Sequence, residues 1–230
     1  HLICGRKYSK TVIYMLNISG SLSEDKAYYE DFINKIFFNL FNTNFKICSQ
    51  RNDELIARLY SKAIAQYFNK LGVKSGKKVD NNCIPRFIFN SDDEVKKSFI
   101  RGVFDTEGSM TFKKDYFGKH SKPIITMKMK SRVFVEQMRD LLEYFGFSVI
   151  FYPTSYLDKR SNRISKGYKI ELAGKKNLAK YTKLIDFRNP RHLTKVEIWK
   201  KYGFYPPRLN YKQRKDVLSG TLNIKSVYFI

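Results

Sequence analysis

The sequence is poor in cysteine, in long apolar runs and in acidic residues. Its three cysteines, Cys4, Cys48 and Cys83, are odd in number and widely spaced, which argues against a disulfide framework and a zinc knuckle. We expect them to fill space in the core. No run approaches the roughly 20 apolar residues of a membrane span, and no charged-then-apolar leader opens the chain. We therefore expect a soluble intracellular protein with no membrane partner.

Histidine and tryptophan are also scarce. His1, His120 and His192 are scattered without the spacing of metal ligands, so we expect them to have no special role. Trp199 lies near the end of the chain, where a tryptophan is more often a packing anchor than a base-stacking residue.

Acidic residues are outnumbered by basic ones. Lysine and arginine total 44 against 21 aspartate and glutamate, a net charge of +23. Residues 1–110 hold 17 basic and 12 acidic residues (+5), whereas residues 111–230 hold 27 and 9 (+18). This charge exceeds what solubility requires, and nucleic acid is the commonest polyanion in a cell. The composition favours a folded nucleic-acid-binding protein.

One pattern of strands and helices occurs twice. The later copy has expected strands at 109–114 and 123–130, a helix at 132–145, strands at 148–154 and 167–173 around a basic loop, and a helix at 174–185. The earlier copy has a hairpin in "HLICGRK" and "KTVIYMLNIS", a helix begun by Ser23, strands in "NFKICSQ" and "DELIARLYS", and a helix in "KAIAQYFNKLG". A displacement of roughly 110 residues predicts an internal duplication.

An additional helix precedes the later copy and ends in acidic residues. In "FIRGVFDTEGSM", Asp105 and Glu107 follow an apolar run and stand just before Gly108. Ser91 and Glu94 form a capping-box pattern at the start, and Gly108 is a stop signal. The acids thus lie where the helix dipole disfavours negative charge. The earlier copy opens at its first strand, so we expect its acidic helix upstream of His1.

The remaining segment, 186–230, differs from both copies. Asn189-Pro190 predicts the start of a helix that ends at Gly203, and "NYKQRKDVLSG" predicts another. We therefore expect three parts: a first repeat with its linker at 1–90, a second repeat at 91–185, and a helical extension at 186–230.

The stretch "IRGVFDTEG" resembles the LAGLIDADG motif of homing endonucleases. Gly102 matches the central glycine of the motif, Asp105 its first acid, Glu107 its catalytic acid and Gly108 its final glycine. The resemblance covers about residues 1–185, the segment 71–89 resembles the inter-repeat linker, and 186–202 resembles the end of archaeal-type members. It implies an α+β fold of two pseudosymmetric αββαββα repeats, whose antiparallel sheets form a DNA-binding saddle.

The resemblance also implies an activity. It predicts a monomeric, site-specific endonuclease of intron or intein origin that hydrolyses phosphodiester bonds of double-stranded DNA with Mg²⁺ or another divalent cation. Glu107 would hold the metal together with the Gly108 or Thr106 carbonyl. Asp105 joins the catalytic set, although its position in the family looks more structural. A double-strand cut requires an acid from each repeat, so activity is impaired if no second acidic motif is present.

Basic and amide side chains are the expected DNA contacts. Lys128 and Lys130 are candidates for the basic neighbour of the acid, with Asn17 at the corresponding place in the first half. We expect phosphate contacts to outnumber base contacts. The candidate DNA-binding residues are Arg6, Lys46, Gln50, Arg51, Arg58, Lys113, Lys119, Lys122, Lys128, Lys130, Arg160, Arg163 and Lys169.

Two non-enzymatic alternatives remain open. One is a non-cleaving LAGLIDADG-fold binder, either an intron maturase whose partner is intron RNA or a DNA-binding regulator. The other is a ribosomal or structural RNA-binding protein, which would explain the charge but not "FDTEG".

Overall fold

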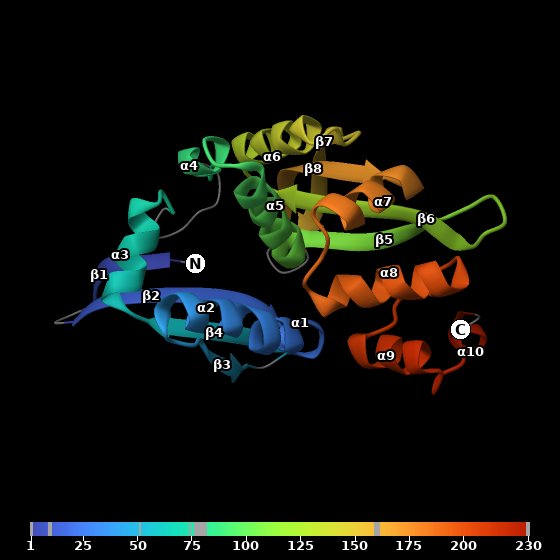
Figure 1. Ribbon diagram of the computed structural model, residues 1–230, viewed down its shortest axis with the longest axis horizontal. Coiled ribbons are helices and arrows are strands. Elements are labelled where there is room, and N and C mark those ends of the chain that lie inside the picture. Colours follow the sequence, from blue (N-terminus) through green and yellow to red (C-terminus); the bar gives the residue numbers. More distant parts are fainter. Residues whose placement is uncertain are drawn as a thin grey trace. The chain divides into compact units, whose positions relative to one another are not determined.

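The computed structural model describes residues 2–8, 11–50, 52–73, 75, 82–158 and 162–228. The chain divides into two compact units, one formed by residues 1–79 with 85–90 and the other by 80–84 with 91–230 (Figure 1). Each unit contains one antiparallel four-stranded sheet. The division of the sequence at 1–90, 91–185 and 186–230 stays a prediction.

The sheet of unit 1 has the strand order β1-β2-β4-β3. Its strands are β1 (Leu2–Tyr8), β2 (Thr11–Ser21), β3 (Lys46–Ser49) and β4 (Glu54–Tyr60). Between β2 and β3, the helices α1 (Leu22–Tyr28), η1 (Tyr29–Ile33) and α2 (Asn34–Phe41) follow one another without a break. After β4 come α3 (Lys62–Lys70) and the short α4 (Arg86–Phe89). Leu16, Leu55, Ala57 and Leu59 form the buried side of the sheet.

The helical segment of unit 1 begins two residues earlier than expected. Ser21, and not Ser23, is the N-cap residue, because its side chain accepts a hydrogen bond from the Glu24 N–H. The Ser23 hydroxyl instead donates to Asp53, 2.9 Å away, and the Ser23 N–H donates to the same carboxylate. Ser23 therefore joins the first turn of the helix to the β3–β4 turn.

The sheet of unit 2 has the corresponding order β5-β6-β8-β7. Its strands are β5 (Gly108–Lys114), β6 (His120–Met129), β7 (Ile150–Asp158) and β8 (Arg163–Ala173). The helices α6 (Arg132–Tyr144) and α7 (Gly174–Leu184) pack on one face of it. Met127, Ile170 and Leu172 are buried there. The shared strand order confirms the predicted duplication and the α+β class.

The predicted basic loop at 155–167 is wrong for most of its length. Strands β7 and β8 continue as a ladder from Ser155 opposite Lys166 to Asp158 opposite Arg163. Tyr156, Leu157 and Ile164 favour extended backbone. This preference, together with the ladder hydrogen bonds, outweighs the mutual repulsion of solvated basic side chains.

The C-terminal segment is packed into unit 2. Its helices are α8 (Pro190–Tyr202), α9 (Tyr211–Ser219) and α10 (Ile224–Tyr228). Asn189 caps the start of α8 and Gly203 ends it, as predicted, whereas α10 was not predicted. The Trp199 ring stacks on Phe112, and its Nε1 donates to the Ser121 carbonyl at 2.9 Å. The packing role of Trp199 is thereby confirmed.

Two further expectations, on the cysteines and on membrane-spanning segments, can be compared with the structure. The three cysteines are free and half-buried. The expectation that they fill the core is met in part, because Cys4 packs against the hydrophobic core of unit 1. In the described part of the chain, no helix has both the length and the apolar character that crossing a membrane requires.

Candidate functional site

The site is built on α5 (Asp93–Glu107), which precedes the sheet of unit 2. Asp92 caps the helix, because its side chain accepts the Val95 N–H at 2.8 Å. The prediction of Ser91 as the cap is therefore wrong by one residue: Asp and Ser cap equally well, and the local backbone selects between adjacent candidates. Asp93 and Glu94 stand in the first turn, where the helix dipole favours acids.

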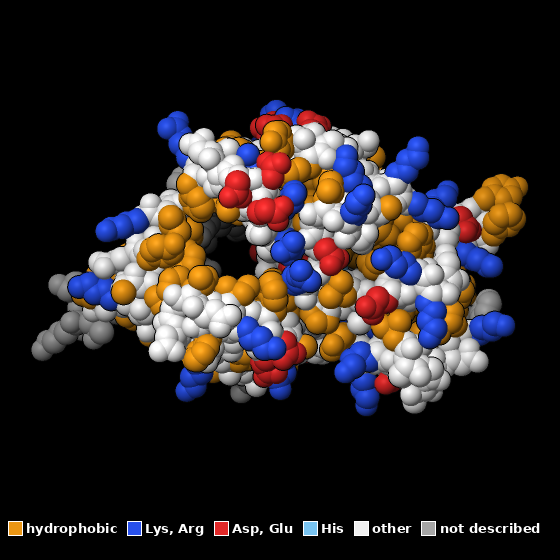
Figure 2. Space-filling view, viewed as in Figure 1, with side chains coloured by type: hydrophobic (Ala, Val, Ile, Leu, Met, Phe, Trp, Pro, Cys, Tyr) orange, Lys and Arg blue, Asp and Glu red, His pale blue; other side chains and the backbone are white. Residues whose placement is uncertain are grey.

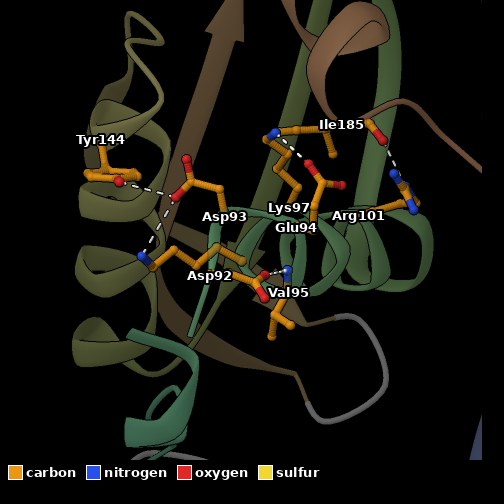
Figure 3. Close-up of polar contacts among 9 residues, drawn as sticks. Asp92, Asp93, Glu94, Val95, Lys97, Arg101, Tyr144 and Ile185 are labelled. Carbon is orange, nitrogen blue, oxygen red and sulfur yellow. Dashed lines mark hydrogen bonds and ion pairs between the residues drawn. The ribbon is translucent and has the colours of Figure 1, made fainter. Parts of the chain in front are cut away.

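Two hydrogen bonds, both drawn in Figure 3, and one buried face fix α5 within unit 2. The Tyr144 hydroxyl on α6 donates to Asp93 at 3.1 Å. Arg101 Nε donates to the Ile185 carbonyl at 2.7 Å. On the hydrophobic side, Ile100 and Phe104 are fully buried. The helix is thus held at its start, middle and buried face, and its last turn has a defined position in the unit.

Gly108 ends α5 and begins β5, as the motif predicts. A Cβ at this position would lie 2.9 Å from the Phe104 Cα and still closer to the Phe104 carbonyl oxygen. Such contacts are essentially never seen, so a side chain at 108 would displace the helix end. Glycine therefore allows the strand to leave the helix immediately after Glu107.

Glu107 is exposed at this helix end. Within the part of the chain that the structure describes, it forms no ion pair. Gly108 pairs with Met127 on β6, which makes Lys128 the next residue of the ladder toward the end of α5. Lys128 is exposed, and Lys130 is exposed just beyond the strand. An acid and a lysine thus lie near one another at the end of β5 and β6.

Asp105 is in a different environment from Glu107, with an exposed fraction of 1%. Its carboxylate accepts the Arg188 N–H at 3.1 Å and the Asn189 N–H at 3.2 Å. In return, Asn189 Nδ2 donates to the Asp105 carbonyl at 3.0 Å. Because Asn189 also caps α8, Asp105 connects the last turn of α5 to the first turn of α8.

His192 lies one turn into α8, with an exposed fraction of 1% and its ring 4.9 Å from that of Phe187. Burial lowers the pKa of His192 well below its usual value of 6.5, and the charges of Lys195, Arg191 and Arg214 act in the same direction. From the sequence, His192 was expected to have no special role. Its spacing of four residues from the buried Val196 is the signal that could have placed it in the interior.

The face of the unit 2 sheet away from α6 and α7 carries four of the predicted contacts. Lys113 pairs with Lys122, and Lys128 pairs with Lys169. All four side chains project from that face, because they alternate with the buried Phe112, Met127 and Ile170. Lys119 is exposed in the β5–β6 turn. Arg160 lies outside the described residues, and the side chain of Arg163 is not described.

One buried acid lies among these lysines. Glu171 Oε1 accepts hydrogen bonds from Lys169 and from the Tyr152 hydroxyl, each at 2.6 Å, and Lys113 is 3.7 Å from Oε2. Burial alone would raise the pKa of Glu171, but the hydrogen bonds from Lys169 and Tyr152 outweigh it and hold that pKa below its usual value. The acid stays ionised at neutral pH and fixes two side chains of the face.

The corresponding face of unit 1 carries the remaining candidates. Arg58 pairs with Asn17 on one side and with Lys46 on the other. Arg6 pairs with Ile13 on the same sheet. Gln50 is exposed after β3, and Arg51 lies outside the described residues. The structure thus brings three basic candidates and Asn17 onto one sheet.

The donor set at the end of α5 fits a hard divalent cation that keeps several waters. No three His, Cys, Asp or Glu side chains of the described ranges cluster as a protein-only metal cage. Mg²⁺ is usually held by one or two carboxylates, with water and substrate phosphates completing the shell. An exposed Glu107 followed by the Gly108 carbonyl fits that type of site, whereas the saturated carboxylate of Asp105 does not.

Comparison with known proteins agrees with this geometry. The family model for a LAGLIDADG-like domain matches residues 94–186. Glutamine--fructose-6-phosphate aminotransferase [isomerizing] of Methanocaldococcus jannaschii is 25% identical over 174 residues, which are 76% of this chain and 15% of that protein. The replication factor C small subunit of the same organism is 29% identical over 136 residues, 59% of this chain and 6% of that protein. The chain therefore spans only a small part of these relatives.

Solved structures show the same fold. A structure of mesophilic variants of the homing endonuclease I-DmoI has a TM-score of 0.52 at 14% identity, over 80% of this chain and 81% of that one. I-DmoI in complex with DNA and Ca has a TM-score of 0.52 at 17% identity, over 84% and 88%. A mutant of I-SmaMI has a TM-score of 0.51 at 12% identity, over 97% and 91%.

These findings define the class of protein first by fold, as an α+β chain with the architecture of homing endonucleases. More particularly, residues 94–186 match the family model for a LAGLIDADG-like domain. The resemblance of "IRGVFDTEG" to the LAGLIDADG motif is thereby confirmed.

Proposed function

We propose that this chain is a site-specific, metal-dependent endonuclease of double-stranded DNA. The observation that carries the proposal is the exposed Glu107 at the C-terminal end of α5, beside a lysine-bearing sheet face. At that helix end a carboxylate is destabilised by the dipole unless positive charge lies close to it. A phosphate-bound cation in a lysine-rich surrounding supplies such charge.

Glu107, Gly108, Lys128 and Asp105 would have different roles in the proposed reaction. Glu107 and the Gly108 carbonyl would hold Mg²⁺ or another divalent cation. When bound, that ion would polarise the scissile phosphate and lower the pKa of an attacking water. Lys128 would neutralise the same phosphate, with Lys130 as its neighbour. Asp105 acts as a positioning residue, because its oxygens are occupied by the backbone of the α8 start.

The two sheets would supply the DNA-binding surface. On unit 2, Lys113, Lys122, Lys128 and Lys169 project from one face, which suits neutralisation of a series of phosphates. On unit 1, Arg6, Lys46 and Arg58 would make the corresponding contacts. We propose that the duplicated chain acts as a monomer, each half binding one part of the target.

The two curated relatives support an origin as a mobile element. Their names describe unrelated activities, yet each shares a segment with this chain that makes up only 15% or 6% of its own length. A segment common to otherwise unrelated proteins is expected of an insert carried by its hosts. We therefore propose an intein origin in preference to an intron origin.

A non-cleaving nucleic-acid binder is the second candidate. It is favoured by one observation: among the described residues, a single helix, α5, ends in the acidic motif. In that case the protein would bind DNA or intron RNA tightly, and binding would not depend on Glu107.

The deciding experiment compares Glu107→Gln with wild type in cleavage and in binding. A plasmid library of random sites is incubated with Mg²⁺, and DNA affinity is measured in parallel without metal. We expect cleavage to disappear while affinity is unchanged or slightly higher. Glu94→Gln is the matched control on the same helix, because Glu94 is exposed at the opposite end, and it should cleave like wild type.

Two results would contradict the proposal. Undiminished cleavage by Glu107→Gln would show that this acid is not catalytic. Tight, salt-sensitive binding by the wild type with no cleavage of any sequence would favour the non-cleaving binder.

A further inference from the structure

The β5–β6 turn of unit 2 displays two aromatic side chains to solvent. Tyr116 has an exposed fraction of 93% and Phe117 of 83%, the highest of any large hydrophobic residue in the described ranges. Figure 2 shows hydrophobic side chains projecting at the end of this hairpin, with basic side chains behind them. Neither ring contributes to the core, so folding does not explain the pair.

The turn is rigid, although its aromatic rings are exposed. The Asp115 carboxylate accepts the N–H groups of Phe117 and Lys119, each at 2.9 Å, and the Ser121 hydroxyl at 2.6 Å. The Asp115 N–H in turn donates to the Lys119 carbonyl at 2.7 Å. Gly118 has a φ of 78°, which the turn requires and which other residues rarely adopt. The two rings are therefore held on a preformed backbone, which reduces the entropy lost on binding.

The C-terminal segment supports the root of the same hairpin. The Tyr228 hydroxyl on α10 accepts the His120 N–H at 3.0 Å and donates to the Gly118 carbonyl at 3.3 Å. The Tyr205 N–H donates to the His120 carbonyl at 2.9 Å. The contact of Trp199 with Ser121 adds a third support, from α8. Helices α8 and α10 thus fix the position of the hairpin within unit 2.

The charges around the turn indicate what the aromatic rings meet. Lys113, Lys114 and Lys122 are exposed on the arms of the hairpin, and Lys119 is exposed in its turn. The only acid in the turn, Asp115, is used by the internal hydrogen bonds. Duplex DNA offers phosphates to the lysines and flat bases to the rings, and apolar side chains that enter between base pairs are a known means of bending it. A neutral apolar partner would leave the lysines unmatched.

We propose that Tyr116 and Phe117 form a wedge that inserts between adjacent base pairs of double-stranded DNA, next to the segment bound by the unit 2 sheet. This inference rests on the proposed DNA-binding function and adds a specificity element to it. The wedge unstacks one base step while the flanking lysines bind phosphates on either side. Pyrimidine–purine steps deform most easily, so the protein would prefer such a step without contacting its base edges.

The experiment uses the whole chain and a target selected with it from random DNA. A single 2-aminopurine is moved stepwise through the target, because its fluorescence rises when stacking is lost. At saturating protein we expect a rise confined to one base step. The double variant Tyr116→Ala/Phe117→Ala should abolish the rise and weaken binding about tenfold, the effect of losing one stacked base.

Two further variants separate insertion from a general loss of structure. Ile164→Ala removes a side chain with an exposed fraction of 71% on the β7–β8 hairpin of the same unit, and it should leave the fluorescence rise unchanged. Tyr228→Phe leaves Tyr116 and Phe117 in place but removes the hydroxyl that supports their turn. This variant should reduce the fluorescence rise. Emission from Trp199 verifies that each variant is folded.

The outcomes test the aromatic wedge separately from the proposed DNA-binding function. If saturable, salt-sensitive binding occurs and no position gives a fluorescence rise, or if the double alanine variant binds as tightly as wild type, the wedge is refuted while DNA binding stands. If no DNA is bound saturably, the proposed function itself fails.

Discussion

The two four-stranded sheets have the same strand order but carry different chemistry on the face away from their helices. In unit 1 that face presents Ile13, Met15 and Ile56 beside a few basic residues, whereas in unit 2 it presents two cross-strand pairs of lysines. Strand order depends on the alternate residues that point to the core. The intervening residues are free to change without altering the topology.

The difference extends to the ends of the sheets. Unit 2 begins with α5, whose acidic end is tied to α8 by Asp105, and α8 in turn supports the β5–β6 hairpin through Trp199. One connected structure in unit 2 thus positions the acid, the lysine-bearing face and the aromatic turn. The duplication produced two sheets with the same strand order. Among the described residues, the proposed catalytic residues lie in only one of the two units, unit 2.

The largest effect is expected from Gly108→Ala. The added Cβ would collide with the backbone of Phe104, and overpacking of this kind lowers the free energy of unfolding by about 1–3 kcal/mol. Because the sequence contains one tryptophan, Trp199 emission in urea reports on unit 2. We expect its transition to move to lower urea.

Gly102→Ala is the matched control for that substitution. Within unit 2, nothing lies within 4 Å of the added Cβ, and alanine is more favourable than glycine inside a helix by about 0.5–1 kcal/mol. The control is therefore expected to be stabilising. Equal destabilisation by both substitutions would show that the helix end at Gly108 is not specially constrained.

An intermediate effect is expected from the titration of His192. Its pKa is lowered in the folded state, so between that pKa and 6.5 the unfolded chain binds a proton that the folded chain does not. The stability of unit 2 should therefore fall as pH drops below about 6.5, with a slope of at most about 1.4 kcal/mol per pH unit. The urea midpoint of Trp199 emission between pH 7.5 and 5.5 measures it.

A histidine variant isolates this contribution. His192→Gln should have a flatter dependence of the midpoint on pH than wild type, whatever its absolute stability. A wild-type slope in His192→Gln would mean that other groups cause the pH dependence.

A smaller effect is expected on the salt dependence of DNA affinity, which should differ between substitutions on the two sheets. Each lysine that neutralises a phosphate contributes about 0.9 to the slope of log affinity against log salt. Replacing the cross-strand pair Lys113/Lys122 by glutamine should therefore reduce the slope by nearly 2. The cross-strand pair Lys46/Arg58 of unit 1 should change it by less, because Arg58 is half-buried. Equal changes would remove the electrostatic distinction between the sheets.

Much of the fold could be predicted because its signals are local. The hydrophobic alternation of "PIITMKMK" and the stop at Gly108 placed β6 and the end of α5 correctly. Local signals also explain the errors: Ser91 and Ser23 are as suitable for capping as Asp92 and Ser21. The basic segment at 155–167 was mistaken for a loop because charge was given more weight than its extended-backbone residues.

The site was predictable only in part, because half of it depends on distant contacts. The position of Glu107 at the end of a helix could be predicted from its motif. The burial of Asp105 depends on backbone groups 83 and 84 positions away, and nothing near it in the sequence indicates that. Glu171 looks like one solvated charge among many until β8 pairs with its neighbours. The exposed aromatic pair was overlooked because the segment between the expected strands at 109–114 and 123–130 was interpreted only as a polar loop, although it contains Tyr116 and Phe117.

The measurement that tests the central claim most directly is the strand count of the cleavage product. A supercoiled plasmid bearing a selected site is incubated with the 230-residue chain and Mg²⁺, and nicked circles are separated from linear DNA. One acid-bearing helix in unit 2 predicts nicked circles, with every nick on the same strand and none from Glu107→Gln. Linear product that persists in Glu107→Gln would contradict the assignment of the catalytic site to the end of α5.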